Sequence, residues 1–133
     1  MRRIRSERGT ATLEFAIVAP VLMLLVLGVL QFGLWYHAEN VARTAALEAA
    51  RTAAAENGSV DAARQRGLDV LDAGLGRAAN GQIVTVSIGG DTAEVRVTAH
   101  IAGLLPIPGL SSFELRGNAS AYRERFRPAG GSP

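Results

Sequence analysis

The sequence predicts an α+β fold: an N-terminal transmembrane helix that continues into a long stalk helix, then a second helix and a small three-stranded antiparallel sheet. Three observations predict it. The 22 residues 15–36 carry no charge, residues 37–56 are rich in alanine without Gly or Pro, and three stretches after residue 80 alternate apolar with polar side chains. The domains expected are a basic leader at 1–9, a transmembrane helix at 10–36, an extracytoplasmic stalk helix and α+β head at 37–126, and a flexible tail at 127–133.

The uncharged stretch 15–36 has the length of a membrane span. As a helix it measures about 33 Å, enough to cross a hydrocarbon core about 30 Å thick. A secretory signal peptide is the alternative, but its apolar part is normally about 7–15 residues long and ends at a small-residue cleavage site. This stretch is longer and leads into Trp35, Tyr36 and His37. The comparison favours a retained single span.

The flanking charges predict the orientation of this span. Four arginines against one glutamate give residues 1–9 a net charge of +3, and such a cluster beside a first span favours the cytoplasmic side. We therefore expect a single-pass protein of the cytoplasmic membrane, with its N-terminus in the cytoplasm and its C-terminal domain outside. Trp35 and Tyr36 stand where an aromatic belt would mark the outer interface, although they could equally be packing residues.

Residues 37–56 predict that the membrane helix continues into water as a stalk. Glu39 and Arg43 are four residues apart, in the favourable order for an ion pair along a helix. The alanine-rich surface permits close helix packing. Two partners for that surface remain open, namely the protein's own domain and a neighbouring subunit.

Asn57-Gly58-Ser59 predicts the end of the stalk, with Gly58 as a left-handed cap and Ser59 as the N-cap of the next helix. That second helix is expected at about 60–79. Its apolar residues form an imperfect stripe, which glycines weaken. These are Gly67, Gly74 and Gly76.

The three alternating stretches predict the sheet. Residues 82–88 and 93–101 flank Gly89-Gly90-Asp91, a hairpin turn, and a third strand is expected at 113–121. The connection between the second and third strands contains the proline-interrupted apolar segment 104–110. This segment either covers the open end of the sheet or forms a contact surface outside the membrane.

No residue pattern indicates catalysis, a metal site or a cofactor site. There is no cysteine, and His37 and His100 are the only histidines. Asp69 and Asp72 are expected on a solvated helix face. The charge also argues against nucleic acid as a partner: the whole chain is +2, so removing the +3 of the leader leaves −1 for the rest. We therefore expect a protein that is not an enzyme.

Glu14 is the one carboxylate at the entrance of the span. A carboxylate driven to the bilayer centre costs about 2.5–3.5 kcal/mol, and less near the interface. Glu14 could therefore simply lie at the interface, where the helix dipole also favours it.

The N-terminal segment resembles type IV pilins and pseudopilins, and most closely the TadE-like family of the tight-adherence (Flp pilus) machinery. A short basic leader precedes a glycine. Four further residues follow, and then come a glutamate, an aromatic residue and a long apolar helix. A weaker match in the C-terminal strands extends the resemblance over most of the chain. The residues that carry it most specifically are Arg8-Gly9, Glu14-Phe15-Ala16, Pro20 and 28–33.

The resemblance implies roles for particular residues. A prepilin peptidase would cut between Gly9 and Thr10, and Glu14 with Phe15 would serve subunit assembly, the carboxylate meeting the new N-terminal amine of a neighbouring subunit. The sequence departs from the family pattern at Thr10, where many pilins carry an aromatic residue, and at Gln31, where many relatives carry an acidic one.

The function implied is structural: a minor pseudopilin or assembly component of a Flp-type pilus or secretion system. Its partners would be the membrane, a prepilin peptidase and other pilin or pseudopilin subunits, and it could enter the pilus itself. The alternative is an uncleaved single-pass membrane protein whose head binds an extracytoplasmic partner. A membrane-anchored hydrolase is a distant third, because the sequence offers no nucleophile for it.

Overall fold

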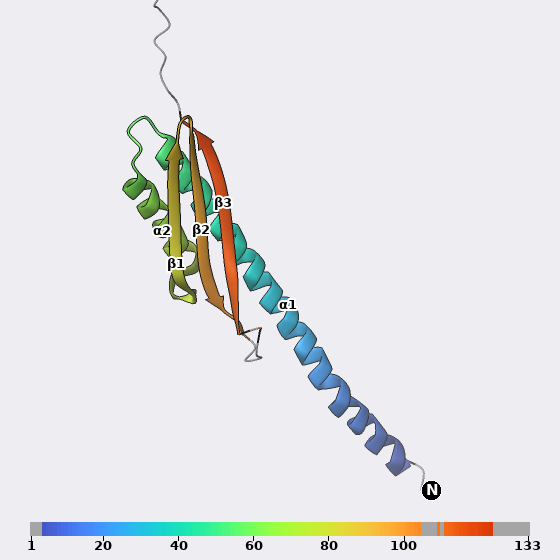
Figure 1. The fold of residues 1–133 in the computed structure, drawn as a ribbon. Helices are drawn as coiled ribbons and strands as arrows, with labels where there is room; N and C mark the ends of the chain where they lie inside the picture. Colours follow the sequence, from blue (N-terminus) through green and yellow to red (C-terminus); the bar gives the residue numbers. More distant parts are fainter. Residues whose placement is uncertain (1–3, 105–108, 110, 124–133) are drawn as a thin grey trace, which may run out of the picture.

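The computed structural model describes residues 4–104, 109 and 111–123, with side chains from Thr10 onward. The fold is α+β, as predicted, and consists of two helices, a short 3-10 turn and a three-stranded antiparallel sheet (Figure 1). The flexible tail expected at 127–133 lies outside the described residues. The elements are α1 (Ile4–Ala54), α2 (Val60–Leu75), η1 (Gly76–Ala78), β1 (Ala79–Gly89), β2 (Thr92–Ala102) and β3 (Ser112–Tyr122).

Helix α1 is continuous from the leader to the end of the stalk. Its 51 residues correspond to a length of about 77 Å, and Pro20 lies inside it. The helix already begins at Ile4, so part of the predicted leader is helical, and it ends at Ala54, two residues before the expected end at Glu56. The predicted union of span and stalk in one helix is therefore confirmed.

The sheet is a meander with strand order β1-β2-β3. Its strands are slightly longer than the alternating stretches that predicted them, and the register pairs Val86 with Val95 and Val97 with Gly117. The turn between β1 and β2 has Gly90 and Asp91 at its centre, with a φ of 51° at Gly90 only. Positive φ at the first central position alone is the pattern of a type II′ turn, which suits the twist of a hairpin.

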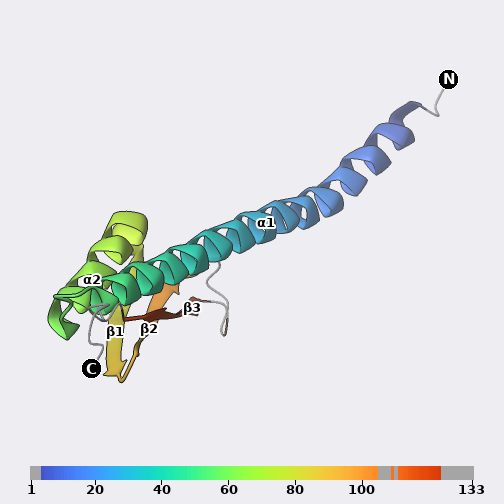
Figure 2. The ribbon, with the colours of Figure 1, turned by 90° about the horizontal axis from the view of Figure 1, so that it is seen from above.

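Both helices cover one face of the sheet, and the other face is open (Figures 1 and 2). The apolar side of the strands packs against the C-terminal half of α1 and against α2, whereas the polar side faces solvent. This two-layer core accounts for the period-two pattern of the strands. Its largest fully buried side chains are Leu71, Leu115 and Val97.

The alanine surface of α1 packs against the protein's own head. Its central alanines have no exposed surface. Glycines permit this close approach: a Cβ on Gly117 would overlap the backbone carbonyl of Ala42, and one on Gly67 would lie 3.4 Å from the Cβ of Ala49. Of the two partners left open, the protein's own domain therefore covers this surface. The fully buried alanines are Ala42, Ala45, Ala46, Ala49, Ala50 and Ala53.

The link between the helices corrects one prediction and confirms another. Gly58 is not a left-handed cap, because its φ is not positive. It is needed for space instead, since a Cβ there would lie 2.6 Å from the carbonyl oxygen of Ala53. Ser59 is the N-cap of α2 as predicted, and its side chain accepts a hydrogen bond from the backbone N–H of Ala62 at 3.1 Å.

Candidate functional site

The N-terminal part of α1, residues 10–34, extends beyond the core of the head and is here called the free segment. No side chain from Thr10 to Leu34 is buried, and no part of the most apolar stretch of the helix is buried in the core. These 25 residues are about 38 Å long, more than the roughly 30 Å of a hydrocarbon core. So long a row of exposed apolar side chains is untenable in water and suits lipid. The helix therefore fits a single-pass membrane protein.

The head begins where this free segment ends. Trp35 packs against the core of the head, and Ala38 is already buried. Tyr36 is 58% exposed and stacks on Phe32, with ring centroids 6.4 Å apart. Of the two interpretations of the aromatic pair, Trp35 is thus a packing residue, whereas Tyr36 remains open to the surroundings of the helix.

The residues of the predicted processing and assembly site lie on successive turns of the free helix. Gly9 and Thr10 are both within α1, and Glu14 follows Thr10 by about 6 Å along the axis. Glu14 is exposed and makes no ion pair with any residue that the structure describes, and Phe15 is 71% exposed. The site therefore offers one carboxylate and one aromatic ring to a neighbour.

Gln31 has a role that the sequence did not reveal. Its side-chain oxygen Oε1 accepts a hydrogen bond from the backbone N–H of Leu104, at 2.7 Å. Leu104 follows β2, so this bond joins the free helix to one end of the sheet. The only signal in the sequence was a polar amide inside an otherwise apolar run.

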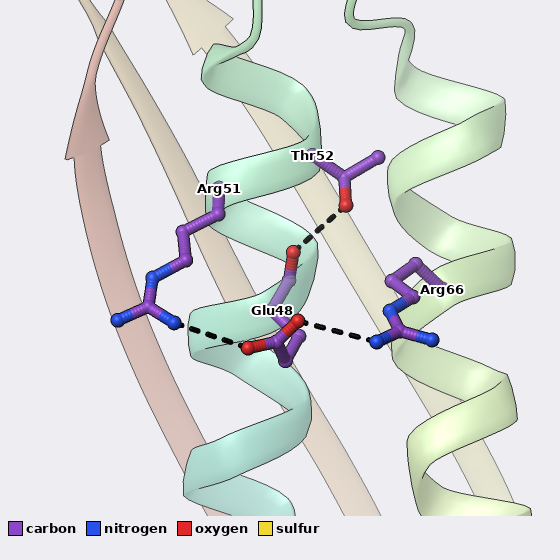
Figure 3. A network of polar contacts seen from close by, with 4 residues as sticks. All are labelled: Glu48, Arg51, Thr52 and Arg66. Atoms are coloured by element: carbon purple, nitrogen blue, oxygen red, sulfur yellow. Dashed lines mark hydrogen bonds and ion pairs between the residues drawn. The ribbon is translucent and has the colours of Figure 1, made fainter.

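Glu48 joins the two helices of the head (Figure 3). It accepts from Arg51 of α1 at 3.1 Å and from Arg66 of α2 at 3.3 Å. The predicted pair between Glu39 and Arg43 is present within α1 at 2.6 Å. Because the arginines are more than half exposed, each pair contributes little to stability. Of the three pairs, that between Glu48 and Arg66 connects α2 to α1.

The open sheet face carries a second polar group. Arg116 donates two hydrogen bonds to Glu114, and this guanidinium holds the pKa of Glu114 below its usual value. His100 lies opposite Glu114 on β2 and is exposed. Within the described ranges, no group of three or more His, Cys, Asp or Glu side chains could hold a metal ion.

Two shallow grooves are lined by described residues. One lies on the open sheet face between Thr85, Glu94, Arg96 and Asn118. The other runs between the helices, past His37 and Asp69. Asp72 accepts from Gln82, and the hydroxyl of Thr44, in the second groove, donates to the backbone carbonyl of Asn40. The free segment of α1 is therefore the candidate functional site.

Comparison with known proteins identifies the same segment. Residues 9–51 match the family model described as TadE-like protein, whereas no curated protein and no solved structure matches the chain. The matched region begins at Gly9, contains the free helix and most of the stalk, and stops before α2. It does not include the strands, where the sequence showed only a weaker resemblance. Residues 9–51 of this chain are thus similar to the TadE-like family, which confirms the predicted resemblance for this segment.

Proposed function

We propose that this protein is a structural subunit of a Flp-type (tight-adherence) pilus or secretion system, as a minor pseudopilin or assembly component. The observation that carries the proposal is an overlap of two segments. The TadE-like match over residues 9–51 contains the whole exposed apolar stretch of α1 from residue 10 to residue 34. The part of the chain that is TadE-like therefore includes the part that is open to lipid or to other subunits.

Processing would change the charge at the cytoplasmic end of α1. Cleavage by a prepilin peptidase between Gly9 and Thr10 removes the leader with its net charge of +3 and leaves a single ammonium group on Thr10. That ammonium group and the carboxylate of Glu14 would each be costly in lipid. Paired between the helices of adjacent subunits, they neutralise one another and fix the relative height of the two helices.

The head would be presented rigidly outside the membrane. It packs directly on α1 from Trp35 to Ala54, and α1 has no break between the free segment and the head. A subunit placed by its free helix thus also determines the orientation of the open sheet face. The surface offered to other components would be this polar face.

Neutralising Glu14 tests the proposal. The Glu14→Gln variant keeps the side-chain shape but leaves the ammonium group of a neighbour without a counterion. We expect at least a tenfold loss (about 1.4 kcal/mol) of site-specific crosslinking to co-expressed pilin subunits in the membrane, with Glu14→Ala behaving alike.

Glu56→Gln is the matched control, because Glu56 is an exposed carboxylate beyond the far end of α1. It should crosslink as the wild type does. Wild-type yields for Glu14→Gln would show that the carboxylate has no role in assembly. Crosslinks of the wild type to envelope proteins alone, with no pilin subunit, would favour the uncleaved membrane protein with a partner-binding head.

A further inference from the structure

We propose that the end of the head formed by Gly103 and Leu104, here called the tip, enters the outer leaflet of the membrane that α1 spans, and that Gln31 holds it there. The tip follows β2 at the end of the sheet that faces the free part of α1 (Figure 1). It would be a second membrane contact, separate from the span. The inference rests on α1 crossing the membrane, but not on cleavage or on pilus assembly.

The hydrogen bond from Leu104 to Gln31 fixes the depth of the tip. Gln31 precedes Tyr36, the last residue of the uncharged run, by five residues, or about 7.5 Å along the helix axis. Side chains on a helix lean toward its N-terminus, which here is the direction into the membrane. The backbone nitrogen of Leu104, 2.7 Å from Gln31 Oε1, therefore lies close to the depth of Gln31.

The length of the uncharged run supports this depth. Residues 15–36 measure about 33 Å, whereas a bilayer is about 40–45 Å thick with its headgroups and about 30 Å without them. If the run is centred on the bilayer, about 1.5 Å extends beyond the hydrocarbon at each end, and Gln31 lies about 6 Å inside the outer hydrocarbon edge. The tip then lies below the headgroups.

The chemistry of the tip suits that depth. Leu104 is 51% exposed, and neither Gly103 nor Leu104 carries a charge that lipid would have to desolvate. The backbone N–H of Gly103 donates to the carbonyl of Ser111 at 2.8 Å, and that of Leu104 donates to Gln31. Backbone donors in lipid need protein acceptors, and both donors of the tip have one. This gives a reason for a glutamine within the apolar run.

Single cysteines test the depth directly, because the chain contains no cysteine of its own. The full chain with Leu104→Cys, carrying a polarity-sensitive fluorophore, is reconstituted into phosphatidylcholine vesicles. Quenching by aqueous iodide is compared with quenching by nitroxide-labelled lipid. The matched sites are Leu25→Cys, within the span, and Ser87→Cys, on the open sheet face.

We expect iodide to quench position 104 at least threefold less than position 87, and the labelled lipid to quench positions 104 and 25 but not 87. If position 104 behaves like position 87 while position 25 is quenched by lipid, the head stands clear of the bilayer and the inference is wrong. If iodide reaches position 25, α1 does not cross the membrane, and both this inference and the proposed function fail. A chain that is not cleaved or does not assemble would still show the expected quenching at position 104. Failure of the proposed function can therefore be distinguished from failure of this inference.

The role of Gln31 is tested by adding Gln31→Leu to the labelled Leu104→Cys chain. This change replaces the amide with an apolar side chain, which lipid tolerates, and removes the acceptor, so iodide quenching at position 104 should rise at least twofold. Gln82→Leu, which removes an exposed amide in the head, is the control and should have no effect on it. An unchanged depth of position 104 in Gln31→Leu would refute the holding role of Gln31.

Discussion

Replacing Gly117 with alanine should lower the free energy of unfolding by about 3 kcal/mol, the upper end of the usual cost of overpacking a core. The added Cβ would lie 2.6 Å from the carbonyl carbon of Ala42 and overlap its oxygen. Both obstacles are backbone atoms of a long helix, so no side chain can rotate away. The helix and the sheet would have to separate, which weakens the whole alanine interface.

The chain offers its own reporter for this prediction. Trp35 is the only tryptophan, and it packs against the core of the head. Its fluorescence in detergent micelles should show a urea midpoint that falls by roughly 1–3 M, given a typical slope of about 1–3 kcal/mol per M. Gly28→Ala is the control, because nothing lies within 4 Å of its added Cβ. Equal midpoints for the two variants would show that the helix does not pack this closely on β3.

Truncation of Leu71 to alanine should cost about 2–5 kcal/mol. Leu71 is fully buried and is among the largest side chains of the core between the two helices and the sheet. Its neighbours on α1 are mostly alanines, which are too short to fill the space that the lost atoms leave. The cavity should therefore persist. The loss of stability should then exceed the free energy of transferring the removed atoms to water.

Leu47→Ala is the matched control for Leu71, since Leu47 is on α1 but 40% exposed. We expect Leu47→Ala to shift the urea midpoint by less than a third as much. Thermal unfolding followed by circular dichroism should rank the two variants in the same way, with the larger fall in Tm for Leu71→Ala. Similar shifts for both leucines would contradict the location of the core.

The fold class could be predicted because its signals are local. The uncharged run, the alanine-rich stretch and the period-two strands each identify their own element, and all of them are present. The partner of the alanine surface could not be predicted, because small side chains permit any close neighbour. Its choice depends on Gly117, which meets Ala42 across 75 residues of sequence. Gly58 was misjudged for a similar reason, since its need for space arises only when the chain turns back.

For the candidate site, too, some features could be predicted from the sequence and others could not. The sequence located Gly9, Thr10, Glu14 and Phe15, and the structure places the side chains of the last three on an exposed helix, but their roles in processing and assembly remain predictions. The bond between Gln31 and Leu104 joins residues 73 positions apart. It depends on how far along α1 the sheet docks, and no local pattern encodes that distance.

The central claim is that the chain is processed as a pseudopilin, and the intact mass of the purified full-length protein tests it most directly. Expression with an active prepilin peptidase should give a chain that begins at Thr10, lighter by residues 1–9, whereas expression without the peptidase should give the full chain. Gly9→Leu should block the change in mass, and Gly28→Leu, within the same helix but away from the junction, should not. A wild-type chain that keeps its arginine leader in the presence of the active peptidase would contradict the account.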